Sequence, residues 1–262
     1  MMRLVTKMLA VCLLLVLRVS HAQAVDPIRV CGDPNPVDWM TPEQRKDHYQ
    51  TYRISGISIE IVKATFKVMG RSGTFIGSLP WNRCLSEVEN GNVEFAMGAY
   101  FNEARSEIFD YSIHYNTLTP QIFYLKSKPV IAVDLSELRR YRGCGLIGSS
   151  YSHYGLKEDE LDLASGYDSL LRRLRAGRCD YFLEELEVIS NFKKIGKNIL
   201  AEPDIDHINA PWASAPSRYL ITGKGRNSKL LEQVNHALEA VIKSGTAKKI
   251  WDLQIQNVPY KP

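Results

Sequence analysis

The stretch LPWNRCLSEVENGNVEFAMGAYFNEARSEIFDYSIHY (residues 79–115) has the pattern of a short helix, then a buried strand, then a loop that carries Arg105. Its first part carries apolar residues at helical spacing and ends at Gly91, a natural cap for a helix. The largely apolar run VEFAMGA (93–99) is typical of a buried strand. Arg105 therefore comes just beyond the exit of a strand and ahead of the aromatic cluster FDYSIHY (109–115).

Elements of the same kinds precede this stretch. IRVCG (28–32) and TFIGSL (74–79) are typical of strands, and GISIEIVKATFKVMG (56–70) has a helical apolar face that ends in glycine. The order β-α-β-α-β implies a parallel sheet with helices on its faces. Residues 33–55 are polar and interrupted by prolines, so we expect them to form mostly loop.

The pattern then restarts, which predicts a second α/β unit in tandem with the first. We expect strands at 120–127, 144–150, 179–185 and 217–225, and helices at 167–177, 187–194, 227–245 and 246–253.

The first 24 residues have the pattern of a secretory signal peptide. Arg3 and Lys7 precede the apolar run 8–17, and cleavage patterns end at Ala22 and at Ala24. A retained N-terminal anchor is the alternative. We expect export to the periplasm and a mature chain without a membrane span.

Charge and motifs exclude several classes of function. Without the three basic residues of the signal, 30 basic side chains face 29 acidic ones, which argues against a nucleic-acid surface. The densest basic run, from Arg172 to Arg178, lies beside leucines at helical spacing and indicates a solvated helix face. No G-x-G-x-x-G, G-x-x-x-x-G-K-[ST], G-x-S-x-G or H-E-x-x-H motif occurs, so we expect no cofactor and no metal ion.

The chain resembles the extracytoplasmic solute-binding proteins of ABC importers, family 3, the polar amino-acid type of type II periplasmic binding protein. The resemblance rests on motifs that follow one another in the family's order over almost the whole mature chain. They are RVCGDPNPVDW (29–39), GISIEIVKATFKVMG (56–70), residues 79–115, GLIGSSY (145–151), LRAGRCDYFLEE (174–185) and LLEQVNHALEAVIKSGTAKKIWDL (230–253).

The resemblance implies an α/β fold of two lobes, each a three-layer α/β/α unit, joined by two crossing strands. Residues 25–118 and 223–262 would form lobe 1, and residues 119–222 would form lobe 2. The crossings would fall near 118–123 and 220–225, with the ligand held in the cleft between the lobes.

Arg105 matches the family arginine that grips the carboxylate of a ligand, for which a guanidinium offers a planar pair of donors. The alternative is a surface ion pair with Glu103 or Asp110. Ser149 and Ser150 match the contribution of the second lobe, where hydroxyl and backbone N–H groups near a helix start can bind the same carboxylate. An ordinary helix cap is the alternative for these serines.

Glu185 matches the family's acidic residue that holds the ammonium group of a ligand. Its neighbour Glu184 would point to the opposite face if the strand continues, and a solvated acid pair at a helix start is the alternative for both. We assign Asp180, at the start of the same strand, to structure.

Aromatic candidates for the cleft are Trp39, Trp81, Tyr100 and Tyr151. Tyr100 stands where the family generally has a small hydroxyl residue, and Asn102 stands where it has threonine. Because of these departures and the long 33–55 loop, the sequence predicts a small anionic or zwitterionic ligand and does not specify an amino acid.

The resemblance implies a monomeric receptor, not an enzyme, that closes over its ligand and delivers it to an ABC permease in the inner membrane. A sensing module for a membrane receptor is one alternative. A second is a dehydratase-like enzyme on the same fold, for which Glu185 with His114 is the candidate acid-base pair.

Four cysteines remain after the signal, namely Cys31, Cys84, Cys144 and Cys179, and an even count in an exported chain suggests disulfides. Four free thiols are the alternative, and the lack of C-x-x-C argues against zinc. When the cysteines are placed on the family's strands, the resemblance implies the disulfides Cys31–Cys84 and Cys144–Cys179. In the chain-entropy model the second would contribute roughly 3–4 kcal/mol to the free energy of unfolding.

Peptide mapping of the mature protein without reductant tests this pairing. We expect two linked peptides, one for each proposed bond, because each pair lies at one end of a common sheet. Free thiols or crossed pairs would contradict the assignment.

Overall fold

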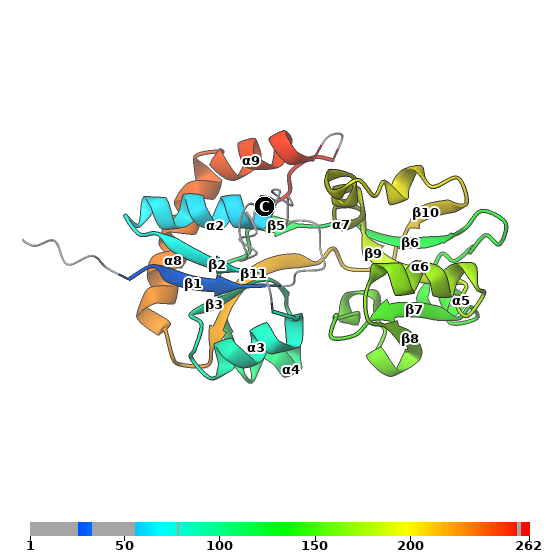
Figure 1. Ribbon diagram of the computed structural model, residues 1–262, viewed down its shortest axis with the longest axis horizontal. Helices are drawn as coiled ribbons and strands as arrows, with labels where there is room; N and C mark the ends of the chain where they lie inside the picture. Colours follow the sequence, from blue (N-terminus) through cyan, green and yellow to red (C-terminus); the bar gives the residue numbers. More distant parts are fainter. Residues whose placement is uncertain (1–25, 33–55, 78, 256–257) are drawn as a thin grey trace, which may run out of the picture.

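The computed structural model describes residues 26–32, 56–77, 79–255 and 258–262, so the predicted signal, the 33–55 loop and Trp39 lie outside the described residues. The chain forms two α/β lobes side by side (Figure 1), each built on its own sheet. The expected fold class is thus confirmed.

The sheet of lobe 1 has the strand order β2-β1-β3-β11-β4, and β5 pairs with β11. Parallel pairing joins β1 to β2 and β3, whereas β11 runs antiparallel to β3 and β4. The bounds are β1 Ile28–Cys31, β2 Gly73–Ile76, β3 Phe95–Tyr100, β4 Phe109–Tyr111, β5 Asn116–Thr117 and β11 Ser217–Gly223.

Helices cover both faces of this sheet. The helices α2 (Ile57–Val68), α8 (Ser228–Lys243) and α9 (Thr246–Gln254) share one apolar core, and α3 (Trp81–Glu89) packs on the other face beside the short α4 (Glu103–Ser106). Amphipathic helices bury an apolar stripe in this way because a sheet needs cover on both faces.

The sheet of lobe 2 has the order β10-β6-β9-β7-β8, with β7 parallel to both β8 and β9. Its strands are β6 Pro120–Leu125, β7 Gly143–Leu146, β8 Leu161–Ala164, β9 Tyr181–Glu185 and β10 Ile205–Asn209. The helices are α5 Leu135–Leu138, α6 Tyr167–Arg175 and α7 Leu186–Asn191, with 3-10 turns at Ser152–Tyr154, Glu158–Glu160, Phe192–Ile195 and Ile199–Ala201.

The expected lobe boundary at residue 222 needs correction, because it cuts through β11. Arg218 pairs with Tyr100 and Gly223 with Phe109, so the whole strand belongs to the sheet of lobe 1. Because β11 forms backbone hydrogen bonds with strands along both of its edges, it is part of this sheet and not the crossing segment expected from the sequence. The return crossing therefore lies between the end of β10 at Asn209 and the start of β11 at Ser217.

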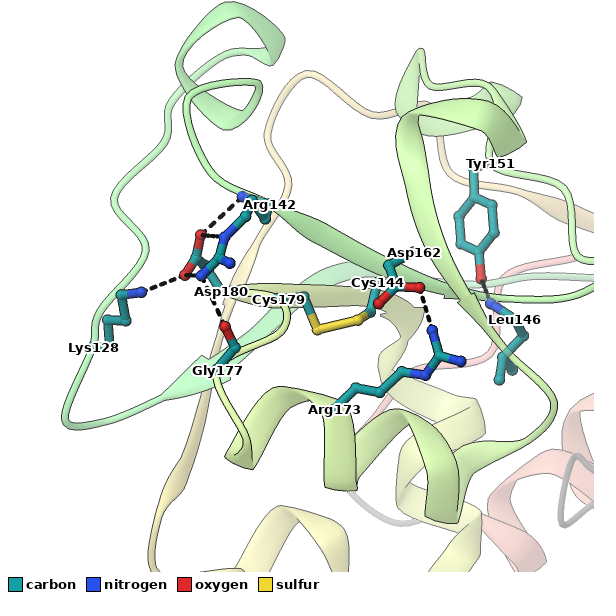
Figure 2. The surroundings of a disulfide bond; sticks show 10 residues. All are labelled: Lys128, Arg142, Cys144, Leu146, Tyr151, Asp162, Arg173, Gly177, Cys179 and Asp180. Carbon is teal, nitrogen blue, oxygen red and sulfur yellow. Dashed lines mark hydrogen bonds and ion pairs between the residues drawn. A yellow bond between two sulfur atoms is a disulfide. The ribbon is translucent and has the colours of Figure 1, made fainter.

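Both proposed disulfides are present. Cys31 at the end of β1 is bonded to Cys84 in α3, and Cys144 on β7 is bonded to Cys179 just before β9. Because β7 and β9 are parallel neighbours, the second disulfide links two adjacent strands near their starts (Figure 2).

A membrane-spanning helix is absent from the described residues, since none of their helices combines the necessary length and apolar character.

Asp180 has the structural role expected for it. Its carboxylate accepts hydrogen bonds from Lys128 Nζ at 2.5 Å and from the backbone N of Arg142 at 2.9 Å, beside the disulfide (Figure 2). Burial raises the pKa of Asp180, but hydrogen bonds from Lys128 and Arg142 outweigh that effect and lower it to about 2. The charged form therefore stabilises the loop before β7.

Asp180→Asn should lower the free energy of unfolding by about 1–2 kcal/mol at pH 7, allowing for solvent screening of the exposed Lys128. The stabilisation is complete above the ordinary pKa of 3.8 and is lost as the pH falls through about 2, so the difference should vanish in acid. Urea unfolding at several pH values measures it. Asp162→Asn, which removes a half-exposed partner of Arg173, is the matched control and should cost less than about 0.5 kcal/mol.

Candidate functional site

A cavity of about 80 Å³ lies between the lobes. The exit of β3 in lobe 1 and the ends of β7 and β9 in lobe 2 meet there, as expected for ligand sites at the carboxyl ends of strands. Lobe 1 contributes Ser58, Trp81, Met97, Gly98, Tyr100, Arg105 and Arg218 to its lining. Lobe 2 contributes Leu146, Gly148, Ser149, Ser150, Tyr151, His153, Tyr167, Leu183, Glu184, Glu185 and Val188.

Arg105 reaches this cavity from the four-residue helix α4. The Asn102 side chain caps this helix by accepting a hydrogen bond from the backbone N of Arg105 at 3.1 Å. The guanidinium donates to the carbonyl oxygen of Tyr100 at 3.1 Å and lies over the Trp81 ring, 5.8 Å from its centroid. These contacts hold the cation against the wall of the cavity.

No carboxylate among the described residues forms an ion pair with Arg105. Of the partners considered from the sequence, Asp110 instead lies 3.3 Å from Lys224 Nζ and accepts a hydrogen bond from the backbone N of Gly225. Burial lowers the pKa of Arg105, but a guanidinium stays charged at any physiological pH. The group is therefore a cation that can accept an external anion.

A bulge in β3 directs Tyr100 into the cleft. The pairing of β11 with β3 passes from Leu220–Met97 to Tyr219–Ala99, which leaves Gly98 as an extra residue on β3. Gly98 has φ +83°, a conformation that favours glycine. In a regular strand, side chains three residues apart point to opposite faces. The bulge shifts this alternation by one residue, so Met97 and Tyr100 both line the cavity.

Two hydrogen bonds cross the cleft at this point. The Tyr100 hydroxyl donates to Glu185 Oε2 at 2.5 Å, and Asn102 Nδ2 donates to Ser150 Oγ at 3.3 Å. Asn102 thus contacts the opposite lobe, although it is not part of the cavity lining. Tyr100 and Asn102, the two departures from the family pattern, both link the lobes directly.

Glu185 is almost completely buried, with 1% of its surface exposed. Its Oε1 lies 2.8 Å from His153 Nε2 and 3.4 Å from the Tyr154 hydroxyl. Burial raises the pKa of Glu185, but hydrogen bonds from His153, Glu184 and Tyr100 lower it to about 2. Glu185 is therefore ionised.

Glu184 also lines the cavity, at the end of β9. Its side chain lies on the opposite face of the sheet from that of Glu185, as predicted, because the Tyr167 hydroxyl donates to Glu184 Oε2 at 2.6 Å, whereas Glu185 contacts Tyr154 in the other core cluster. Burial, the negative charge of Glu185 and a hydrogen bond to it raise the pKa of Glu184 well above its ordinary value. The directions of the two pKa shifts favour a proton on Glu184 and a negative charge on Glu185.

The loop after β7 carries the remaining predicted residues. Ser149, Ser150 and Tyr151 lie on the cavity wall. The Tyr151 hydroxyl accepts a hydrogen bond from the backbone N of Leu146 at 2.6 Å (Figure 2), and its ring fills the space beside Gly145 that a Cβ would take. Tyr151 therefore stabilises the loop, whereas Ser149 and Ser150 line the cavity just before the 3-10 turn Ser152–Tyr154.

His153 and Arg218 are among the residues of the site that sequence reasoning missed. His153 follows β7, and its partner Glu185 ends the parallel neighbour β9, so pairing of those strands could have brought them together. Arg218, the second residue of β11, lies opposite Tyr100 in the antiparallel pairing of β11 with β3. His114, which was paired with Glu185 in the enzyme hypothesis, packs on the Tyr219 ring and does not line the cavity.

The described part of the chain holds no group of three or more His, Cys, Asp or Glu side chains able to bind a metal ion.

The family model for bacterial extracellular solute-binding proteins, family 3, matches residues 28–253. The chain belongs to this family.

Solved structures with the same fold include other members of this broad class. A histidine kinase sensor domain with similarity to periplasmic binding proteins aligns at TM-score 0.72 with 22% identity, over 91% of this solute-binding protein and 99% of that chain. The arginine-, lysine-, histidine-binding protein ArtJ from Geobacillus stearothermophilus aligns at 0.69 with 18% identity, over 89% and 97%. An ancestral amino acid-binding protein, AncCDT-1, a precursor of cyclohexadienyl dehydratase, aligns at 0.67 with 17% identity, over 88% and 96%.

At these identities the likeness shows the fold alone. No curated protein matches the chain in sequence. The ligand of this solute-binding protein must therefore be inferred from its own cavity.

Exchange of each glutamate for glutamine tests the charge assignment in the cavity. Because the pKa of Glu184 is raised in the folded protein, the folded chain keeps this proton above about pH 4.5, whereas the unfolded chain releases it. The free energy of unfolding of the wild type therefore falls as the pH rises. Glu184→Gln should therefore be more stable than wild type at pH 7, with the difference shrinking toward pH 4. Chemical unfolding across this pH range provides the measurement.

Glu185→Gln should behave in the opposite way. It removes a buried, hydrogen-bonded charge and should cost roughly 3 kcal/mol of unfolding free energy at pH 7. The cost should diminish as the pH falls through about 2, where the wild-type carboxylate takes up a proton. Equal effects of the two exchanges at pH 7 would show that the charge has been assigned to the wrong glutamate.

Proposed function

We propose that the protein is an extracytoplasmic receptor that captures a small polar ligand bearing a carboxylate in the cavity between its lobes. The observation that carries this proposal is the Arg105 guanidinium, which lines the cavity without a carboxylate partner among the described residues. A guanidinium binds a carboxylate through two parallel hydrogen bonds. The hydroxyls of Ser149 and Ser150 supply further donors from the opposite lobe.

Closure of the lobes provides the mechanism of capture. Charge-assisted hydrogen bonds contribute roughly 1.5–3 kcal/mol each, and micromolar affinity requires about 8 kcal/mol. Arg105 in lobe 1 is therefore insufficient alone, and the serines of lobe 2 complete the site only when the lobes meet. Ligand shifts the open and closed populations by the difference between these contacts.

The proposal includes delivery to an ABC permease in the inner membrane, which is supported by membership of the family and by the likeness to the substrate-binding protein of an amino acid ABC transporter. The proposal includes removal of the signal peptide (1–24), a periplasmic location and a monomeric receptor. Lobe 1, as proposed, comprises 25–118 with β11 and the chain beyond it, and lobe 2 comprises the residues from 119 to the end of β10.

A sensory role is the second candidate, and the similarity to a histidine kinase sensor domain favours it. The same cavity would bind the ligand, and the closed form would contact a membrane receptor in place of a permease. Affinity capture with the ligand-loaded protein separates the two roles by recovering either a permease or a receptor.

Arg105→Ala should weaken binding of a carboxylate ligand by about 100-fold, because it removes a two-pronged charged contact. Arg105→Lys should retain part of the affinity, since a lysine supplies the charge but not the planar pair of donors. A thermal-shift screen with amino acids, small carboxylates and amines identifies the ligand, and titration calorimetry then compares the variants.

Arg139→Ala is the matched control, because Arg139 forms a surface ion pair with Glu160 and neither residue lines the cavity. It should bind ligand as wild type does. If Arg105→Ala binds the identified ligand equally well, another group is the anchor and the proposal fails.

A further inference from the structure

The cavity between the lobes is small for a ligand site. Its volume is about 80 Å³, whereas ligand pockets commonly enclose about 300–1,000 Å³. A buried cavity of about 150 Å³ is large enough for benzene, which has six carbon atoms. A ligand that fits this cavity therefore has no more than roughly six non-hydrogen atoms.

The ring of Tyr100 crosses the cleft beside this space. The bulge at Gly98 directs the ring from β3 of lobe 1 toward lobe 2, where its hydroxyl donates to Glu185 Oε2 at 2.5 Å. Tyr100 and Glu185 both line the cavity, so the ring occupies room that a ligand would otherwise have. The small hydroxyl residue that the family generally has at this position would leave that room open.

Contacts with lobe 2 hold the Tyr100 ring in place. The His153 ring packs edge-on against it, with 5.5 Å between the two centroids. Its acceptor is fixed as well, because Glu185 Oε1 lies 2.8 Å from His153 Nε2 and 3.4 Å from the Tyr154 hydroxyl. Since Glu185 is only 1% exposed, a ligand that displaced the ring would take a donor away from a buried acceptor, which opposes binding.

Two further contacts between the lobes oppose a wider opening for a larger ligand. Asn102 Nδ2 donates to Ser150 Oγ at 3.3 Å across the cleft. A Cβ atom at Gly148 of lobe 2 would lie 2.6 Å from Asn82 Oδ1 of lobe 1, so the two lobes touch there. A ligand too long for the closed cavity would separate these groups and move Ser149 and Ser150 away from the anchor in lobe 1.

We infer that Tyr100 selects the ligand by size, and that the ligand is a carboxylate of no more than about six non-hydrogen atoms, such as one with two or three carbon atoms. The ring excludes longer chains from the cavity that Arg105 lines. This inference rests on the proposed function and specifies the size of ligand that the same cavity accepts.

Titration calorimetry on the mature protein with carboxylates of increasing length tests the inference. Three series are used, namely unsubstituted, 2-hydroxy and 2-amino carboxylates, each from two to six carbon atoms. In any series that binds, the two- or three-carbon member should bind best. The five- and six-carbon members should bind at least about 10-fold more weakly, because one methylene in a pocket changes binding by about 10- to 200-fold. Binding of these longer members within 10-fold of the best member, or tighter, overturns the inference.

Tyr100→Ser tests the role of the ring, because it restores the small hydroxyl residue of the family. The longer members should gain at least about 10-fold in affinity relative to the shortest ones. Tyr100→Phe keeps the ring and removes only the hydroxyl that bonds to Glu185, so its length preference should stay closer to that of wild type. An unchanged preference in Tyr100→Ser, or an equal loss of preference in both variants, contradicts the assignment of size selection to the ring.

Tyr141→Ser is the matched control, because Tyr141 packs against a core cluster of lobe 2 and does not line the cavity. Its length preference should be that of wild type, and a change like that of Tyr100→Ser would contradict a specific role for Tyr100. Thermal unfolding confirms that each variant is folded before titration. Should Tyr100→Ser fail to fold, Tyr100→Leu, which also lacks the ring, takes its place, and the wild-type series decides the ligand size in either case.

Arg105→Ala separates failure of this inference from failure of the proposed function. If the longer members bind best and Arg105→Ala weakens that binding by about 100-fold, the receptor proposal stands and the size limit is wrong. If no member of any series binds, or if Arg105→Ala binds as wild type does, both proposals fail.

Discussion

The buried negative charge of Glu185 is the constraint on which the arrangement of the cleft depends. A carboxylate at this depth must be fully hydrogen-bonded, because an unpaired buried charge costs several kcal/mol. Its hydrogen-bond partners come from both lobes, with Tyr100 on one side and His153 and Tyr154 on the other. The same hydrogen bonds therefore join the lobes and stabilise the buried charge.

The anchor for a ligand and the link between the lobes come from one short segment. The exit of β3 supplies Tyr100, Asn102 and Arg105 within six residues, and the bulge at Gly98 turns the first of these toward lobe 2. The Trp81 ring under the guanidinium belongs to α3, which the Cys84 disulfide ties to the end of β1. The disulfide thus helps to hold the aromatic platform on which Arg105 rests.

Much of the candidate site could be predicted because its residues follow strand ends. Arg105 and Trp81 flank β3 and its preceding helix, and Glu185 ends β9, so the local pattern together with the resemblance to the family was enough to select them. His153 lies in a polar loop where the sequence offers no periodicity to distinguish it. Its importance follows from a contact with Glu185, 32 residues away, that depends on the parallel pairing of β7 and β9.

The sequence by itself determined the order of strands and helices, the two-lobed α/β class and the presence of a cation at a strand exit, because periodicity, glycine caps and turn residues are local properties. Only the tertiary structure decided that β11 belongs to the sheet of lobe 1, that Glu184 faces the cavity and that Glu185 carries the charge. These properties depend on burial and on hydrogen bonds between residues far apart in the chain, such as Tyr100 and Glu185. Local sequence does not encode such distances, because they arise only when two lobes with separate cores are brought face to face.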